Sequence, residues 1–166
     1  MGSGKSYIGR LLAAKMGLQF VDLDSIIEST EEAKIAQIFV NEGETYFRQI
    51  ESQILRGVRK WDNMVVATGG GAPCFHNSMD WMNENGLTIY LKATAELLLS
   101  RLKNESEHRP ILGGRTDLDL LDFIKSKIVE RSPFYSKATL TIEQETDGEH
   151  IVEEIINALY ERLHSN

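Results

Sequence analysis

The chain of 166 residues has the composition of an ordinary globular protein, with 42% hydrophobic and 26% charged residues and a formal net charge of −7. This balance excludes a disordered or fibrous protein, and the acidic charge argues against binding to nucleic acid or to an anionic membrane, which would need a basic surface. The length suits one compact α/β domain, and we expect a single domain over residues 1–166.

The sequence also lacks the marks of a membrane or secreted protein. No segment approaches the roughly 20 consecutive apolar residues of a membrane helix, and the N-terminus has no apolar signal-peptide centre. Cys74 is the only cysteine, so no intramolecular disulfide can form. These features are typical of a cytoplasmic protein.

Strand-like and helical patterns alternate along the chain. The predicted strands cover residues 18–21, 64–68, 87–91 and 138–142. The predicted helices cover residues 7–16, 33–40, 44–60, 95–103, 118–132 (ending before Pro133) and 151–163. Alternation of this kind predicts a three-layer α/β sandwich with a parallel sheet covered by helices on both faces.

The chain opens on a glycine-rich segment directly before the first predicted helix, with Gly2, Ser3, Gly4, Lys5 and Ser6. It resembles the second half of a P-loop, whose backbone N–H groups cradle phosphates while the lysine reaches the β- and γ-phosphates and the serine holds magnesium. The leading glycine of the full motif and the strand before it are absent. We therefore expect Met1 to be an internal methionine of a longer protein, and a Gly/Ser-rich expression scar is the alternative.

Asp22 and Asp24 follow the first predicted strand. Two carboxylates spaced by two residues on an extended chain face the same side. One could then hold magnesium through water while the other accepts a hydroxyl proton. The alternative is that Asp24 caps the following helix.

Phe47, Arg48 and Glu51 share one face of the helix predicted over 44–60. An arginine held by a neighbouring glutamate is a rigid fork for a substrate carboxylate. The alternative is a structural ion pair beside a core phenylalanine.

Three glycines, Gly69, Gly70 and Gly71, end the second predicted strand. Such a turn costs much chain entropy, which favours a loop that offers backbone donors to a ligand. A tight structural turn is the alternative.

Two further arginines are candidates for ligand binding. Arg109 lies in the polar segment 104–116, from which it could move over a phosphate, and a solvated surface arginine is the alternative. Arg131, near a predicted helix end, is either a second carboxylate ligand or a cation favoured by the helix dipole. The histidines show no metal-ligand spacing.

These motifs, in this order, resemble the shikimate kinase family over essentially the whole chain: GSGKS, DLD, FRQIE, TGGGA, RPIL and ERSPFY. The resemblance implies a nucleoside monophosphate kinase-like fold with a five-stranded parallel sheet, whose first strand is missing here, substrate-binding helices near residues 24–60 and a lid near 104–116. It implies transfer of the γ-phosphate of ATP, with Mg²⁺, to the 3-hydroxyl of shikimate, in the route to chorismate and the aromatic amino acids.

The resemblance also implies a role for each matched residue. Lys5 contacts the transferring phosphate, Ser6 holds Mg²⁺ with help from Asp22 through water, and Asp24 binds the reacting hydroxyl as base. The further substrate contacts are Phe47, Arg48, Glu51, Gly69, Gly70, Gly71 and Arg131, with Arg48, Arg131 and the Gly70 N–H on the carboxylate. The further nucleotide contacts are Gly2, Ser3, Gly4, Tyr7, Arg101 on the adenine and Arg109 from the lid.

Three expectations complete the picture. Asp24 is expected to have a low pKa, so that it orients the hydroxyl as much as it removes the proton. The segment 143–147 offers no cation to adenine, so no adenine contact is assigned there. The partners are shikimate and ATP, bound by a monomer without nucleic acid or membrane; the alternatives are another small-metabolite kinase, such as one for gluconate, and a catalytically impaired nucleotide-binding protein.

Overall fold

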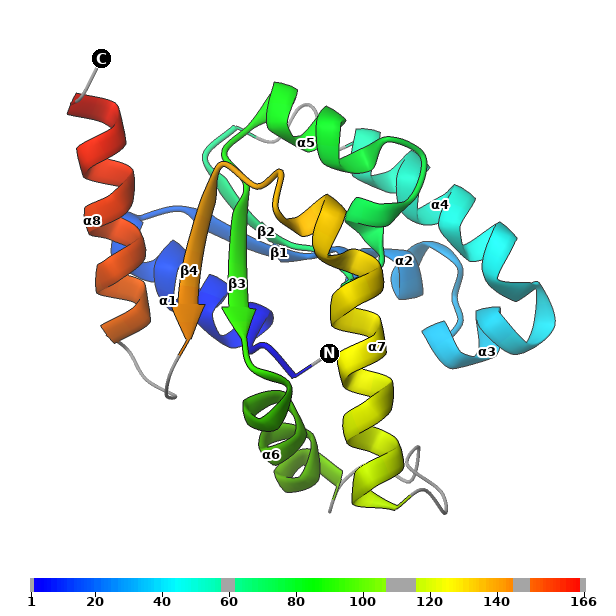
Figure 1. Ribbon diagram of the computed structural model, residues 1–166. Helices are drawn as coiled ribbons and strands as arrows, with labels where there is room; N and C mark the ends of the chain where they lie inside the picture. Colours follow the sequence, from blue (N-terminus) through cyan, green and yellow to red (C-terminus); the bar gives the residue numbers. More distant parts are fainter. Residues whose placement is uncertain (1, 58–61, 107–115, 145–149, 165–166) are drawn as a thin grey trace. The chain divides into compact units, whose positions relative to one another are not determined.

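The computed structural model describes residues 2–57, 62–106, 116–144 and 150–164 (Figure 1). The chain divides into two compact units. The N-terminal unit is Lys5–Leu87, and the C-terminal unit joins the residues before Lys5 to the part from Thr88 onward. The polypeptide passes from one unit to the other inside the glycine-rich segment, between Gly4 and Lys5.

The N-terminal unit holds one pair of parallel strands and most of its helices. Its elements are α1 (Lys5–Met16), β1 (Gln19–Asp22), α2 (Leu23–Thr30), α3 (Ile35–Asn41), α4 (Gly43–Gly57), β2 (Met64–Ala67), the 3₁₀ turn η2 (Ala72–Cys74) and α5 (Ser78–Asn85). β1 and β2 pair in parallel register from Gln19 opposite Met64 to Asp22 opposite Ala67. Both strands therefore end at the same edge, where Asp22 begins α2 and the glycines follow β2.

The apolar faces of α2, α3 and α4 form the core that fixes α4. Its buried residues are Leu23, Ile27, Ile38, Phe47, Ile50 and Leu55. In α4 these residues recur at three- to five-residue intervals, which is the spacing of one helix face. Burial of that face turns the side chains of Phe47 and Glu51 inward.

The C-terminal unit holds the other parallel pair. Its elements are β3 (Ile89–Ala93), α6 (Ala95–Ser106), α7 (Asp117–Tyr135), β4 (Leu140–Gln144) and α8 (His150–His164). β3 and β4 pair from Ile89 opposite Leu140 to Ala93 opposite Gln144, and α8 packs against β4 (Figure 1). Helices α6 and α7 pack together through a core around Ala95, Leu120 and Ile124.

The α/β class with parallel strands is confirmed, and every predicted strand and helix has a counterpart. In the described part of the chain, four strands form two parallel pairs. Sequence periodicity did not predict three elements, α2, η2 and α5, although the family resemblance implied helices near residues 24–60. The short helices carry too few turns for periodicity to separate them from loops.

Several predicted boundaries were wrong by one to three residues, among them the ends of α7 and β4. Helix α7 continues through Pro133 to Tyr135, although the proline removes one backbone N–H donor from the helix. The last strand was predicted to end at Ile142 but reaches Gln144. Gln144 is therefore part of the sheet rather than of the loop beyond it.

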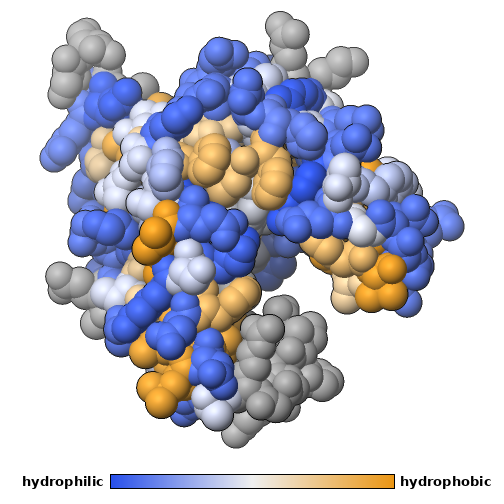
Figure 2. Space-filling model, turned by 45° about the vertical axis from the view of Figure 1, so that its right-hand side comes forward, coloured by the Kyte–Doolittle hydropathy of each residue, from blue (hydrophilic) through white to orange (hydrophobic). Residues whose placement is uncertain are grey.

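The visible surface is mainly hydrophilic, with apolar patches separated by polar residues (Figure 2). Large exposed apolar residues include Val40, Leu118, Val129 and Tyr160. Within the described ranges, none of the helices combines the length and apolar character that a bilayer crossing requires.

Candidate active site

The glycine-rich segment lies directly before α1, the position that a phosphate-binding loop takes before its helix. Gly2 and Gly4 have φ angles of +64° and +73°, a left-handed conformation that glycine adopts without steric cost. Lys5 is the first residue of α1, so the loop delivers its backbone N–H groups and the lysine to a helix N-terminus. The helix dipole favours an anion at such a position.

Ser6 and Asp22 meet at the start of α1. The Ser6 hydroxyl donates a hydrogen bond of 2.5 Å to Asp22 Oδ2, and both side chains are partly buried. The other oxygen, Asp22 Oδ1, accepts from the backbone N–H of Asp24 at 3.1 Å and caps α2. The cap of α2 is therefore Asp22, and the alternative that Asp24 serves as a helix cap was wrong.

The Ser6 and Asp22 pair also fits a magnesium ion. A hydroxyl and a carboxylate are hard oxygen ligands, and Mg²⁺ is commonly held by one or two protein oxygens together with phosphate and water. No group of three or more histidine, cysteine, aspartate or glutamate side chains suited to a metal occurs among the described residues. A metal at Ser6 and Asp22 would therefore need the phosphates of a nucleotide to complete its coordination.

Asp24 has a perturbed carboxyl group. The surrounding protein removes water from the carboxyl group, and this desolvation raises the pKa of Asp24. The negative charges of Asp22 and Glu28 raise the pKa further, whereas the positive charges of Lys5 and Arg48 lower it. By surface area, however, Asp24 as a whole is an exposed residue. The expectation of a low pKa took no account of this loss of hydration, and the upward shift makes the carboxylate a stronger base than an ordinary aspartate.

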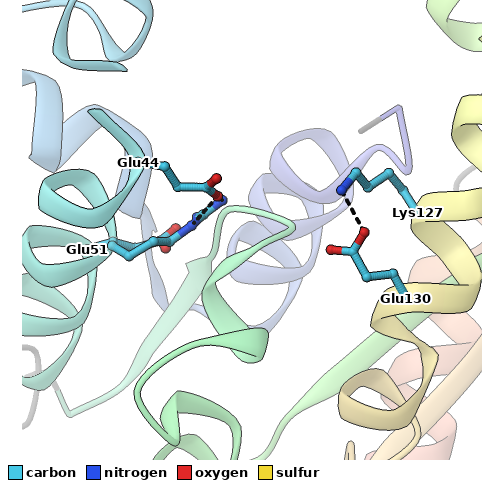
Figure 3. A network of polar contacts seen from close by, with 5 residues as sticks. Glu44, Glu51, Lys127 and Glu130 are labelled. Atoms are coloured by element: carbon cyan, nitrogen blue, oxygen red, sulfur yellow. Dashed lines mark hydrogen bonds and ion pairs between the residues drawn. The ribbon is translucent and has the colours of Figure 1, made fainter. Parts of the chain in front are cut away.

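Arg48 is held as a fork by two glutamates of its own helix. Its Nη1 donates to Glu51 Oε2 at 2.7 Å, and its Nε and Nη2 both donate to Glu44 Oε1 at 3.2 Å. Figure 3 shows the side chains of Glu44 and Glu51 extending to the same side of α4. Glu51 is 2% exposed, whereas the Glu44 side chain is 58% exposed, so the inner glutamate is fixed and the outer one can move.

The loop after β2 closes against these charged groups. A Cβ at Gly69 would lie 2.7 Å from Glu51 Oε1 and 3.1 Å from Asp24 Oδ1, and one at Gly71 would lie 2.6 Å from Arg48 Cζ. Such distances leave no room for any side chain. The loop thus brings its backbone directly against Asp24, Arg48 and Glu51. That it offers backbone donors to a ligand stays a prediction.

Two aromatic residues of the site were missed in the sequence. The ring centroids of Phe75 and Phe39 lie 4.6 Å and 5.9 Å from Arg48 Cζ, in addition to Phe47 at 5.0 Å. Phe39 and Phe47 also contact each other, with centroids 4.5 Å apart. Arg48 therefore lies among three aromatic faces, an arrangement that stabilises a guanidinium and restricts its motion.

The remaining predicted residues lie in both units. Tyr7 is 58% exposed on α1, and Arg131 is half-buried on α7. Arg101, on α6, donates from Nη1 to the carbonyl oxygen of Gly2 at 3.3 Å and to Gln144 Oε1 at 2.7 Å. Gly70 lies between the two close-packed glycines, and Arg109 lies outside the described residues.

The fold is that of a P-loop kinase. Its strands are parallel, a glycine-rich segment leads directly into α1, and Ser6 and Asp22 meet at the start of that helix. The family model for shikimate kinase matches residues 1–160. The chain belongs to the shikimate kinase family and is an ATP-dependent phosphotransferase.

Individual proteins agree with this assignment. A shikimate kinase from Parabacteroides distasonis is 42% identical over 164 residues, which are 98% of this chain and 95% of that protein. The crystal structure of shikimate kinase from Bacteroides thetaiotaomicron superimposes with a TM-score of 0.86 at 35% identity, covering 98% of this chain and 93% of the other. The structure of shikimate kinase from Acinetobacter baumannii in complex with shikimate superimposes with a TM-score of 0.83 at 30% identity. The match covers 100% of this chain and 89% of the other.

Proposed function

We propose that this kinase transfers the γ-phosphate of ATP to the 3-hydroxyl of shikimate, with Asp24 as the group that receives the hydroxyl. The observation that carries the proposal is the convergence of Asp24, Arg48 and Glu51 on Gly69 and Gly71. A carboxylate and a guanidinium thus lie against the same loop. An acceptor that carries both a hydroxyl and a carboxylate matches that pair, and the relative from Acinetobacter baumannii was crystallised with shikimate.

Asp24 orients the acceptor hydroxyl and accepts its proton. Its raised pKa brings the carboxylate closer in basicity to the alcohol, while the positive charges of Lys5 and Arg48 act to lower that pKa. Phosphoryl transfer requires little covalent chemistry from the protein, so most of the rate comes from alignment of the hydroxyl and stabilisation of charge. Lys5 supplies that charge at the start of α1, and Arg109 is the second cation of the proposal.

Arg48 binds the carboxylate of the acceptor. Glu51 fixes one edge of the guanidinium, and the three phenylalanine rings limit its tilt, so little side-chain entropy is lost when a ligand binds. Glu44 is the exposed partner and can leave the guanidinium edge to a ligand carboxylate. Arg131 and the Gly70 N–H are the further carboxylate ligands of the proposal.

Ser6 and Asp22 would hold Mg²⁺ on the nucleotide. When bound, the ion neutralises charge on the phosphate oxygens and fixes their geometry. The Ser6 hydroxyl already donates to Asp22, so the two oxygens are within reach of one ion. Gly2, Ser3, Gly4 and Tyr7 complete the nucleotide contacts of the proposal.

The test is ADP release with MgATP across a panel of acceptors that includes shikimate and gluconate. We expect turnover with shikimate and at most weak turnover with gluconate, and the reverse order would favour the gluconate-type alternative. Asp24→Asn should lower kcat by about 10²–10⁴-fold, the usual contribution of a general base. Asp122→Asn, at an exposed position on α7, is the matched control and should leave kcat unchanged.

Full turnover by Asp24→Asn with unchanged affinity for shikimate would remove Asp24 from the mechanism. Binding of MgATP without turnover of any acceptor would favour the impaired nucleotide-binding protein. The single cysteine supports a cytoplasmic location, and the acidic net charge supports a monomer. Light scattering on the purified protein tests the monomer.

A further inference from the structure

Gln144 is a buried polar residue for which the mechanism above has no use. It is the last residue of β4, and it is 3% exposed. A buried side-chain amide is costly unless its donor and acceptor both find partners. Both ends of this amide do: Oε1 accepts from Arg101 Nη1 at 2.7 Å, and Nε2 donates to the carbonyl oxygen of Ser3 at 3.1 Å.

The same arginine extends the contact by one residue. Arg101 Nη1 also donates to the carbonyl oxygen of Gly2 at 3.3 Å. Two successive carbonyls of the glycine-rich segment are therefore held by two side chains that hold each other. Gly2, Ser3, Gln144 and Arg101 all belong to the C-terminal unit, so the network is internal to one compact unit.

The geometry of the peptide bond links these carbonyls to the phosphate-binding groups. In a planar trans peptide the C=O of one residue and the N–H of the next point in opposite directions. Fixing the carbonyls of Gly2 and Ser3 therefore fixes the directions of the N–H groups of Ser3 and Gly4. These are the backbone donors that precede Lys5 and the first turn of α1.

A glycine-rich loop needs such a restraint. Gly2 and Gly4 have left-handed φ angles, and glycine has more conformational freedom than any other residue. Without contacts to its carbonyls the loop would sample many orientations, and ATP binding would have to select one of them. Holding the loop before the ligand arrives reduces that entropic cost.

We propose that Gln144, acting with Arg101, is a positioning residue that orients the backbone N–H groups of Ser3 and Gly4 toward the phosphates of ATP. The proposal rests on the phosphate-binding role of residues 2–6 proposed above. It assigns Gln144 an effect on the nucleotide and none on the acceptor.

The test compares variants of two neighbouring residues of β4. Gln144→Met keeps the length of the side chain and removes both hydrogen bonds, whereas Gln144→Glu can keep the bond to Arg101 and loses the donor to Ser3. Glu143→Gln is the matched control, since Glu143 is 71% exposed by side chain and pairs with Lys92. Steady-state kinetics give KM for ATP and for shikimate, and calorimetry gives Kd for both ligands.

We expect both Gln144 variants to raise KM and Kd for ATP by about tenfold, the effect of one lost hydrogen bond to an oriented group. KM and Kd for shikimate should stay within about twofold, and Glu143→Gln should match the unaltered protein. If the pair acts as a unit, the double variant of Gln144→Met with Arg101→Met should be no weaker for ATP than the weaker single variant.

Unchanged affinity for ATP in both Gln144 variants would overturn the inference, as would an equal loss for ATP and shikimate, which indicates general destabilisation. Should Gln144→Met fail to fold, the ATP affinity of Gln144→Glu alone decides, because that variant retains one of the two contacts. Absence of ATP binding by the unaltered protein would instead refute the proposed function itself, so the two failures are distinguishable.

Discussion

The replacement of Gly71 by alanine tests the idea that the loop after β2 and Arg48 form one substrate-binding surface. Gly71 has a φ angle of −89°, which alanine adopts without strain. By backbone entropy alone the substitution would stabilise the protein by about 0.4–1 kcal/mol. The side chain has no space, however, because its Cβ would lie 2.6 Å from both Cζ and Nη1 of Arg48.

The guanidinium cannot move aside easily. Its Nη1 is bound to the buried Glu51, and the Phe75 ring lies 4.6 Å from Cζ. Overpacking of a filled site typically costs about 1–3 kcal/mol, so we expect a net loss of roughly 1–2 kcal/mol. In a chain of this size, Tm should fall by about 2–4 °C for each kcal/mol.

The effect on function should be larger than the effect on stability. If Gly71→Ala displaces Arg48, KM for shikimate should rise by about tenfold or more, the weight of one charge-assisted hydrogen bond. KM for ATP should be unchanged. The measurements are thermal unfolding and kinetics with each substrate varied in turn.

Gly57→Ala is the control, because nothing lies within 4 Å of a Cβ at that position of α4. Its Tm should be equal to or slightly above that of the unaltered protein. The reasoning would be refuted if Gly71→Ala kept both its Tm and its KM for shikimate, since Arg48 would then have room that the packing denies.

Three further predictions concern individual side chains. Because the folded-state pKa of Asp24 lies above its usual value of 3.8, its ionisation opposes folding, so Asp24→Asn should raise Tm at neutral pH. The gain should disappear as the pH falls to about 3.8, and a lower Tm for this variant at neutral pH would show that burial does not govern the group. Phe75→Ala should raise KM for shikimate by about two- to fivefold, because Arg48 loses a cation–π contact worth about 0.5–1 kcal/mol, while an unchanged KM would exclude the ring from the site. Lys127→Ala removes the exposed ion pair with Glu130 drawn in Figure 3 and should change Tm by less than about 2 °C, and a larger fall would mean that the pair is structural.

Local sequence patterns predicted the parts of the site that depend on neighbours along the chain. The order of Gly4, Lys5 and Ser6 predicts a loop directly before a helix. The three-residue spacing of Arg48 and Glu51 puts both side chains on one face of α4. A helix fixes such pairs by its own geometry, so tertiary contacts are not needed to predict them.

The tertiary structure decided everything that joins distant segments. Sequence spacing could not show that Asp22 rather than Asp24 caps α2 while binding Ser6, because the second contact spans 16 residues. Nor could it show the loss of hydration that raises the pKa of Asp24 above its ordinary value.

The contact between Gln144 and Ser3 is the extreme case, since it spans 141 residues. No local periodicity records such a pairing, and Gln144 looked like part of a polar loop. The sequence by itself determines which motifs are present and in what order. The contacts, solvent exposure and charged neighbours of each side chain are decided only when folding brings distant segments together.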